Sequence, residues 1–219
     1  RENVQIIYVE KLLPNLVLAI SEPTQLYFPS DEIYRDSEDS ILSPYPMESG
    51  TVYSAISSEV REVPELLKRL TSVDPRFKVL RKRYIQLPKE LQGENRVHTL
   101  ALDITKNSAS PYSKVQALVG YLHRNYAYDI DVPPYPEKSD VADYFLFEQK
   151  SGYCEQFATA LAVLAREVGL PSRYVTGFLP GTYNPLTGYH EVKGSDAHAW
   201  TEIWIPNYGW LAFDATPPG

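Results

Sequence analysis

Cys154, His198 and Asp214, in the second half of the chain, have the residue types and the order of a nucleophile, a base and an orienting acid. Cys154 is the only cysteine, and it precedes a stretch, 157–168, in which apolar residues recur at helical spacing. A thiol in the first turn of a helix feels the positive end of the helix dipole, which favours the thiolate form. The pattern therefore indicates a nucleophilic cysteine.

A single unpaired cysteine is more often a small buried apolar residue than a nucleophile. The stretches 196–204 and 209–216 change that balance, because they supply a histidine and an acid in the order Cys, His, Asp. In this interpretation Cys154 attacks an amide carbonyl, His198 carries the proton, and Asp214 holds the imidazole in the required tautomer. The resulting thioester would pass to another amine or to water.

The pairing of the two C-terminal strands decides whether His198 and Asp214 can meet. A four-residue loop would pair Ile205 with Trp210 and turn Asp214 to the face away from His198. A five-residue loop, or one bulge, would pair Trp204 with Trp210 and make His198 and Asp214 diagonal neighbours on one face. We therefore expect the longer loop or a bulge.

Stabilisation of a negatively charged tetrahedral intermediate requires hydrogen-bond donors. The backbone N–H of Cys154, at the start of its helix, is one natural donor. The sequence does not identify a second one, and Tyr128 and Gln156 are the candidates. Tyr153 and Trp200 are candidates for contacts with the substrate.

Other polar residues receive structural interpretations. Glu202 is assigned to a salt bridge in preference to a role beside the substrate, and His190 is structural or close to the substrate, with His198 preferred as the base. The proline- and tyrosine-rich loop 126–139 is either functional or a strap over the core. Its acids, at 129, 131, 137 and 140, lack the glycine and spacing of a calcium loop, so no metal site and no cofactor are expected.

Length and composition indicate a folded globular chain. The 219 residues can bury a substantial core, and one cysteine excludes an internal disulfide framework. A net charge of -7 without a long basic block argues against a nucleic-acid surface. The longest apolar run, 12–20, is broken by Pro14 and is too short to span a bilayer. Because the chain opens on Arg1, we interpret it as a fragment of a longer protein.

The pattern of elements predicts an α+β fold in two parts, a β-rich region over 1–83 and a core over 84–219. Strands are expected at 3–10, 16–20, 25–28, 51–59, 79–87 and 172–179. A solvated loop is expected at 34–40 and a turn-rich loop at 180–188. Helices are expected at 64–70, 94–106, 111–122 and 157–168, and a short one capped by Ser139 through Phe147.

Four blocks of the sequence resemble the transglutaminase-like superfamily, and most closely the extracytoplasmic domain of bacterial membrane-anchored protein-glutamine gamma-glutamyltransferases. The blocks, in the family's order, are 152–158 (GYCEQFA), 169–178 (GLPSRYVTGF), 196–202 (DAHAWTE) and 209–216 (GWLAFDAT). Segments 84–88 and 143–147 also fit the pattern. One departure is Ala215, where the family pattern has proline.

The resemblance implies a papain-like cysteine protease core in which an antiparallel sheet packs on the cysteine helix. It implies that Cys154, His198 and Asp214 are the catalytic residues, that a glutamine-bearing protein or peptide is the acyl donor, and that an amine such as lysine is the acceptor. It also implies a catalytic domain outside the cytoplasm, held at the cell membrane by segments absent from this chain. The calcium dependence of animal relatives does not carry over, because no matching ligands are visible.

Two other functions stay open. A cysteine peptidase or amidase would use the same residues with water as the acceptor. A catalytically silent assembly module would keep the motif as core packing. A hydrophobic tunnel that keeps water from the thioester would favour the transferase over the hydrolase.

Overall fold

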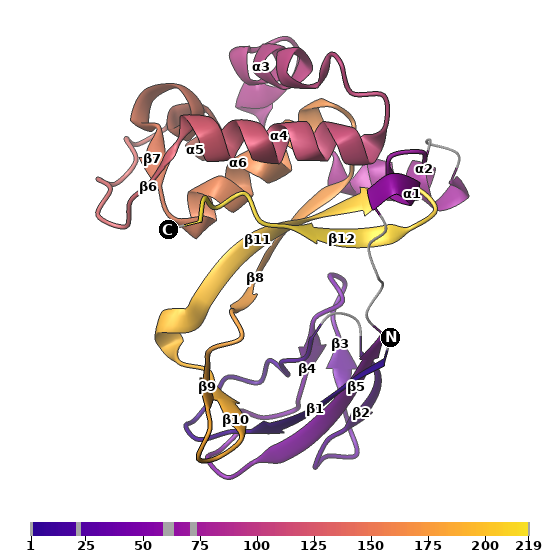
Figure 1. Cartoon of the computed structure of the whole chain (residues 1–219), viewed down its shortest axis with the longest axis vertical. Coiled ribbons are helices and arrows are strands. Elements are labelled where there is room, and N and C mark those ends of the chain that lie inside the picture. The colour runs from indigo at the N-terminus through magenta and orange to yellow at the C-terminus, as the bar shows by residue number, and fades with distance from the viewer. Residues whose placement is uncertain (1, 21–22, 59–63, 71–73, 219) are drawn as a thin grey trace. The chain divides into compact units, whose positions relative to one another are not determined.

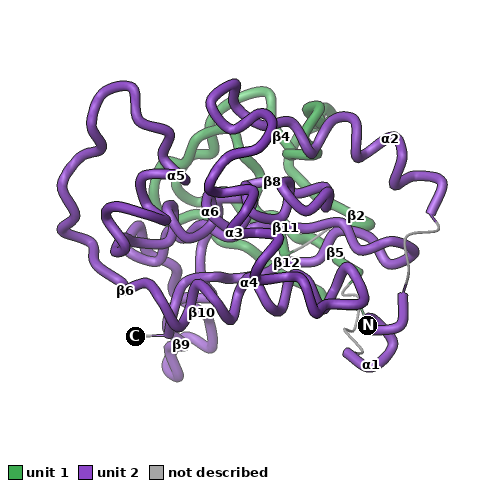
Figure 2. Tube along the Cα trace, turned by 90° about the horizontal axis from the view of Figure 1, so that it is seen from above, with its two compact units in different colours: residues 1–62 green, residues 63–219 purple. Residues whose placement is uncertain are grey.

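A computed structural model of the chain describes residues 2–20, 23–58, 64–70 and 74–218. The chain divides into two compact units, residues 1–62 and residues 63–219, which Figure 2 shows in different colours. Each unit has its own cluster of buried apolar side chains.

The first unit is built on an antiparallel sheet. Its strands are β1 (Glu2–Tyr8), β2 (Pro23–Tyr27) and β5 (Val52–Ser58), in the order β1-β5-β2. Segment 34–40, expected to be a loop, lies at a small hairpin of β3 (Tyr34–Arg35) and β4 (Ile41–Leu42). The buried cluster contains Val9, Val17, Met47 and Tyr53.

The strand expected at 16–20 is absent, and only an isolated bridge joins Leu16 to Leu42. The Tyr53 hydroxyl takes the place of a neighbouring strand here. It accepts a hydrogen bond from the Leu18 backbone N–H at 3.2 Å and donates one to the Leu18 carbonyl at 2.9 Å. A side chain thus satisfies backbone groups that a sheet ladder would otherwise pair.

The second unit packs helices on a three-stranded antiparallel sheet (Figure 1). The sheet order is β12-β11-β8, with β8 (Ser172–Phe178), β11 (Ala197–Ile205) and β12 (Gly209–Phe213). Its helices and short segments are α1 (Pro64–Leu67), α2 (Pro75–Tyr84), η1 (Lys89–Leu91), α3 (Arg96–Thr105), α4 (Pro111–Asn125), α5 (Val141–Tyr144), η2 (Phe145–Gln149), α6 (Cys154–Glu167) and η3 (Gly194–Asp196). β6 (Ala127–Tyr128) pairs in parallel with β7 (Ser151–Gly152), the strand that comes just before α6 in the chain.

The prediction of a strand over 79–87 is wrong, because most of that segment belongs to α2. The residues before it explain the difference. Asp74 caps the helix by accepting a hydrogen bond from the Arg76 N–H at 2.9 Å, and Pro75 takes the first helical position. These start signals lie N-terminal to the residues on which the strand prediction rested.

The turn-rich loop expected at 180–188 contains a strand. β9 (Thr182–Asn184) pairs with β10 (Tyr189–Glu191) in a hairpin that connects β8 to β11. The helices expected over 64–70, 94–106, 111–122 and 157–168 are present, and Ser110 caps α4 as expected.

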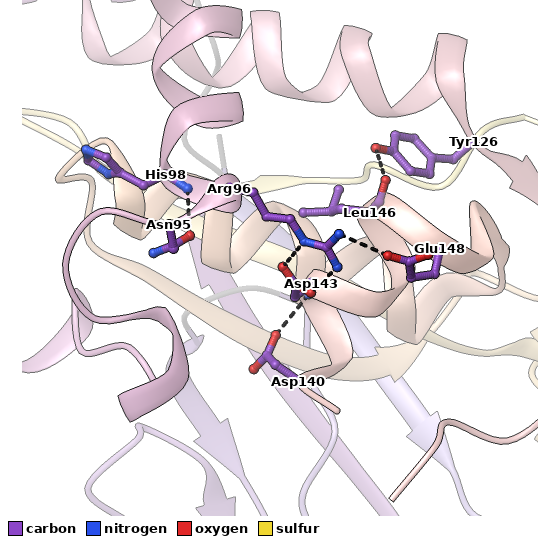
Figure 3. A network of polar contacts seen from close by, with 8 residues as sticks. All are labelled: Asn95, Arg96, His98, Tyr126, Asp140, Asp143, Leu146 and Glu148. Carbon is purple, nitrogen blue, oxygen red and sulfur yellow. Dashed lines mark hydrogen bonds and ion pairs between the residues drawn. The ribbon is translucent and has the colours of Figure 1, made fainter. Parts of the chain in front are cut away.

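The segment that leads to the cysteine helix is held by one arginine (Figure 3). Arg96, at the start of α3, reaches between Asp143 and Glu148, with Nε 2.8 Å from Asp143 Oδ1 and Nη1 2.9 Å from Glu148 Oε1. The short helix there is capped by Asp140 and not by Ser139, since Asp140 Oδ1 accepts from the Asp143 N–H at 2.9 Å. This Arg96 clamp, formed by Arg96, Asp143 and Glu148, joins α3 to the segment of α5 and η2, which is far from α3 in the sequence.

The division between the two units lies N-terminal to the boundary expected at residues 83 and 84. Residues 74–84 are held in the second unit. The Asp74 carboxylate accepts hydrogen bonds from the Trp204 indole at 3.3 Å and from the Asn207 backbone N–H at 3.0 Å. The Tyr84 ring packs edge-on against Trp210, with centroids 5.0 Å apart. Among the described helices none is long and apolar enough to cross a bilayer.

Candidate active site

Cys154 is the first residue of α6, and its thiol is free and partly exposed. The body of the helix is buried, with Phe157, Ala158 and Leu161 in the core. Gln156 fixes the turn that precedes the cysteine, because its Oε1 accepts from the Tyr153 backbone N–H at 2.9 Å. The first N–H groups of a helix have no intrahelical acceptor. The thiol therefore stands where free backbone donors favour negative charge.

His198 and Asp214 are in direct contact. The distance from His198 Nε2 to Asp214 Oδ2 is 2.7 Å. The hairpin register explains this contact: Trp204 pairs with Trp210, as predicted. Ile205 also pairs with Gly209, so the loop is 206–208 and is shorter than the five residues expected. Continued past the last paired residues, this register makes His198 and Asp214 diagonal neighbours on one face.

The contact assigns roles to the ring nitrogens. In the neutral imidazole one nitrogen carries the proton and the other is an acceptor. Because a carboxylate only accepts, Nε2 carries the proton and donates a hydrogen bond to Asp214, and Nδ1 is the nitrogen left to take a proton. Asp214 is itself held, since its Oδ1 accepts from the Thr216 backbone N–H at 2.8 Å. This turn forms with Ala215 where the family pattern has proline.

One buried hydrogen bond joins the cysteine helix to the histidine strand. The Thr201 hydroxyl donates to the Ala158 carbonyl at 2.7 Å. Ala199, Thr201 and Ile203 form the buried side of β11, and α6 packs on it. The structure thus brings His198 and Asp214 together and places Cys154 at the start of the helix that packs on the histidine strand.

The four lower-ranked candidates lie around these elements. Tyr128, half exposed, pairs through its backbone with Gly152, two residues before the cysteine. The Tyr153 hydroxyl is 3.4 Å from Glu155 Oε2. Gln156 is buried; its amide oxygen accepts from the Tyr153 N–H, and its amide nitrogen is the atom that could donate to an oxyanion. Trp200 lies beside His198, with ring centroids 6.4 Å apart.

Two tyrosines near the cysteine helix were not predicted as site residues. Burial raises the pKa of Tyr174 on β8, and negative charge at Glu155 and Cys154 raises it further. Strand alternation could have found this residue, because Tyr174 pairs with Thr201 of the helix-facing side. Tyr135 packs edge-on against Tyr144, and burial raises its pKa despite the opposing effect of the Gln156 amide. This packing favours the strap interpretation of the loop.

Glu202 and His190, the other two polar residues considered in the sequence, each have an identified neighbour. Glu202 forms the predicted salt bridge, with Arg173 Nε 2.7 Å from Glu202 Oε2. The Arg173 guanidinium also lies 4.6 Å from the centroid of the Trp210 ring. His190 lies on β10 against the Tyr183 ring. Nowhere in the described ranges do three or more His, Cys, Asp or Glu side chains gather so as to hold a metal ion.

Comparison with known proteins gives a consistent result. The model of the transglutaminase-like superfamily matches residues 98–215. A protein-glutamine gamma-glutamyltransferase of Pseudomonas aeruginosa (strain PAO1) is 38% identical over 154 residues, which are 70% of this chain and 22% of that protein. The YebA protein of Bacillus subtilis (strain 168) is 36% identical over 166 residues, which are 73% of this chain and 22% of YebA. The chain thus spans about a fifth of these relatives.

A solved structure agrees over nearly the whole chain. The periplasmic domain of TgpA from Pseudomonas aeruginosa superposes with a TM-score of 0.73 and 29% identity, covering 98% of this chain and 68% of the other. The fold is the expected α+β arrangement of transglutaminase-like and papain-like cysteine protease structures, with an antiparallel sheet packed on the cysteine helix. By its family match, this chain belongs to the transglutaminase-like superfamily.

Proposed function

We propose that the chain is the catalytic domain of a protein-glutamine gamma-glutamyltransferase, with Cys154 as nucleophile, His198 as base and Asp214 as orienting acid. The observation that carries the proposal is the 2.7 Å contact between His198 Nε2 and Asp214 Oδ2. It is supported by the position of Cys154 at a helix N-terminus and by the similarity to a relative that bears this name. The catalytic core is assigned to residues 84–219.

The first half of the reaction forms a thioester. His198 Nδ1 accepts the thiol proton, and the Cys154 sulfur attacks the side-chain carboxamide carbon of a glutamine. The backbone N–H of Cys154 donates to the oxygen of the tetrahedral intermediate. The carbon–nitrogen bond then breaks, His198 returns the proton to the leaving nitrogen, and ammonia departs. Asp214 stabilises the imidazolium that exists between these two proton transfers.

The second half consumes the thioester. A primary amine, such as a lysine side chain, attacks the thioester carbon and gives up a proton to His198 Nδ1. The carbon–sulfur bond breaks, and His198 protonates the departing Cys154 sulfur. The products are an amide bond between the two side chains and the free enzyme.

The expected partners are therefore a glutamine-bearing protein or peptide and an amine acceptor. The similarity to a periplasmic domain supports a place outside the cytoplasm. We assign attachment to the cell membrane to segments beyond this chain. The location assignment stands or falls separately from the chemistry.

Amine incorporation tests the chemistry directly. The purified chain is incubated with casein as glutamine donor and a labelled primary amine, and label transfer is scored together with ammonia release. The Cys154→Ala variant is the control for the nucleophile. Label transfer that disappears in the control is the expected result.

Other outcomes assign the chain to the alternatives. Ammonia or peptide release without label transfer would indicate a hydrolase that uses the same residues. Absence of transfer and of release, together with a Cys154 that no alkylating reagent modifies, would indicate an assembly module. Either result would overturn the transferase proposal.

A further inference from the structure

Gly177 lies directly opposite His198 in the ladder between β8 and β11. Its backbone does not lie in the left-handed region, so backbone conformation does not require glycine here. A Cβ at this position would lie 2.6 Å from Cη2 and 3.1 Å from Cζ3 of Trp200. Carbon atoms of packed side chains keep about 3.5–4.0 Å apart. Glycine is therefore needed because the indole fills the space a side chain would use.

Trp200 lies on β11 two residues after His198, and its side chain reaches the space beside Gly177. It pairs with Val175, so its side chain leans across β8 toward Gly177 and the position opposite His198. The indole and the imidazole are close to parallel, with centroids 6.4 Å apart and an angle of 23° between the rings. This separation is within the range of interacting aromatic pairs.

The imidazole of His198 thus has two neighbours. Asp214 holds Nε2 at 2.7 Å, and Trp200 lies alongside the ring. The His198 side chain is only 12% exposed. A hydrogen bond at one ring nitrogen still allows the ring to swing about that bond. A neighbouring indole of fixed position restricts the swing.

We propose that Gly177 and Trp200 are positioning residues for His198: the glycine admits the indole, and the indole fixes the imidazole so that Nδ1 meets the Cys154 thiol. The inference rests on the proposed function, since it concerns the base of that reaction. In this proposal Trp200 positions the base, His198, whereas the sequence analysis suggested that Trp200 contacts the substrate. The two roles differ in one respect, because only a positioning role changes the reactivity of Cys154 when no substrate is present.

Alkylation of Cys154 by iodoacetamide measures that reactivity. The thiolate sulfur bonds to the methylene carbon and iodide leaves, and intact-mass spectrometry follows the product at pH 6 in the full chain. The variants are Gly177→Ala, Trp200→Phe and the two combined. Gly194→Ala is the matched control, because a Cβ at Gly194 meets no atom within 4 Å and its φ is not in the left-handed region.

In Gly177→Ala the indole must move, and the imidazole loses its neighbour. We expect alkylation and kcat for amine incorporation to fall together by about 10- to 100-fold, with KM unchanged, because small misplacements of reacting groups cost this much. The smaller ring of Trp200→Phe leaves room for a methyl group. The combined variant should therefore recover to the rate of Trp200→Phe alone, while Gly194→Ala keeps the wild-type rate.

The inference is overturned if Gly177→Ala alkylates as fast as Gly194→Ala, or if the combined variant is as slow as the product of the two single effects. If Gly177→Ala does not fold, the alkylation rate of Trp200→Ala tests the proposal in its place. A folded Trp200→Ala with slow alkylation supports the positioning role, and one with wild-type alkylation excludes it. The proposed function fails separately, when wild-type protein alkylates readily and transfers no amine.

Discussion

His198 Nε2 lies 2.7 Å from Asp214 Oδ2, although the two residues are on different strands and sixteen positions apart. The Asp214 side chain is 47% exposed and the His198 side chain 12%. The acid therefore keeps contact with water while it orients a ring that is largely covered. This combination suits an acid that stabilises an imidazolium and is not itself protonated.

Replacement of Asp214 by alanine should lower kcat by roughly 10²- to 10⁴-fold, because the ring loses its tautomer preference and the partner of its charged form. Folding should change little, since the carboxylate is half exposed. Amine incorporation and thermal unfolding measure the two effects.

Asp196→Asn is the control for this prediction. Like Asp214→Ala, it removes one negative charge, in this case two residues before His198. The Asp196 carboxylate accepts a hydrogen bond from the Lys193 backbone N–H at 2.6 Å. We expect it to keep most of the activity. Equal losses of kcat in Asp214→Ala and Asp196→Asn would mean that net charge near the site, and not the ring contact, is what matters.

Much of the site could be predicted because its signals are local. Helical spacing after Cys154 predicted α6, and strand alternation with loop length predicted the pairing of Trp204 with Trp210. Both arguments use residues within a few positions of one another. The contact of His198 with Asp214 follows from that register.

Features that depend on distant residues were not predicted. The strand assignment over 79–87 failed for a local reason, because it did not use the cap at Asp74. The bond from the β11–β12 loop to the Asp74 carboxylate, 133 residues away in the sequence, could not be predicted from spacing. Sequence spacing also did not reveal that Gly177 leaves room for Trp200. The hydrogen bond that the Gln156 oxygen accepts from the Tyr153 N–H likewise depends on side-chain direction.

The bond from the Thr201 hydroxyl to the Ala158 carbonyl predicts a coupling between the cysteine helix and the histidine strand. Thr201→Val keeps the shape and removes the bond, so the free energy of unfolding should fall by about 1 kcal/mol. The rate of Cys154 alkylation should fall with it, because the helix loses one of its ties to β11. Chemical denaturation and intact-mass alkylation measure the two changes.

Thr105→Val is the matched control for this coupling. The buried Thr105 hydroxyl donates to the Ala101 carbonyl at 2.8 Å, within a single helix. Its replacement should lower stability without slowing alkylation. If both valine variants slow alkylation equally, the coupling is a general effect of stability.

The Arg96 clamp predicts a salt-dependent contribution to stability. Hydrogen bonds with Asp143, and then with Glu148, raise the pKa of Arg96 above its already high value, so the guanidinium stays charged. Arg96→Met should lower the free energy of unfolding by about 1 kcal/mol, because the partly exposed pair is bidentate.

Lys106→Met provides the comparison for Arg96. Lys106 follows the same helix and pairs with Asp103, three residues earlier, at 2.8 Å. Thermal unfolding at low and at high salt should show a larger loss for Arg96→Met, and the difference should shrink as salt screens the clamp. A larger loss for Lys106→Met would contradict the prediction.

Asp74 predicts a defined pH dependence of stability. Burial alone raises the pKa of this carboxyl, but hydrogen bonds from the Asn207 and Arg76 backbone N–H groups and from the Arg76 guanidinium outweigh it, and the net pKa is lowered. A carboxyl whose folded-state pKa is depressed stabilises the fold above its unfolded-state pKa. That stabilisation is lost as pH falls through the folded-state value.

Asp74→Asn should therefore lower the free energy of unfolding by about 2–3 kcal/mol at pH 7, because an amide donor group replaces one charged acceptor among buried N–H groups. Below about pH 4 the carboxyl of the unfolded wild-type chain takes up a proton, and that of the folded chain follows at a lower pH, so the difference between the two proteins should shrink. Urea denaturation at pH 7 and at pH 3 measures both values. Asp103→Asn, at an exposed carboxylate, should change stability little at either pH. A difference for Asp74→Asn that stays constant across this range would show that the charge of Asp74 has no part in holding α2 to the β11–β12 hairpin.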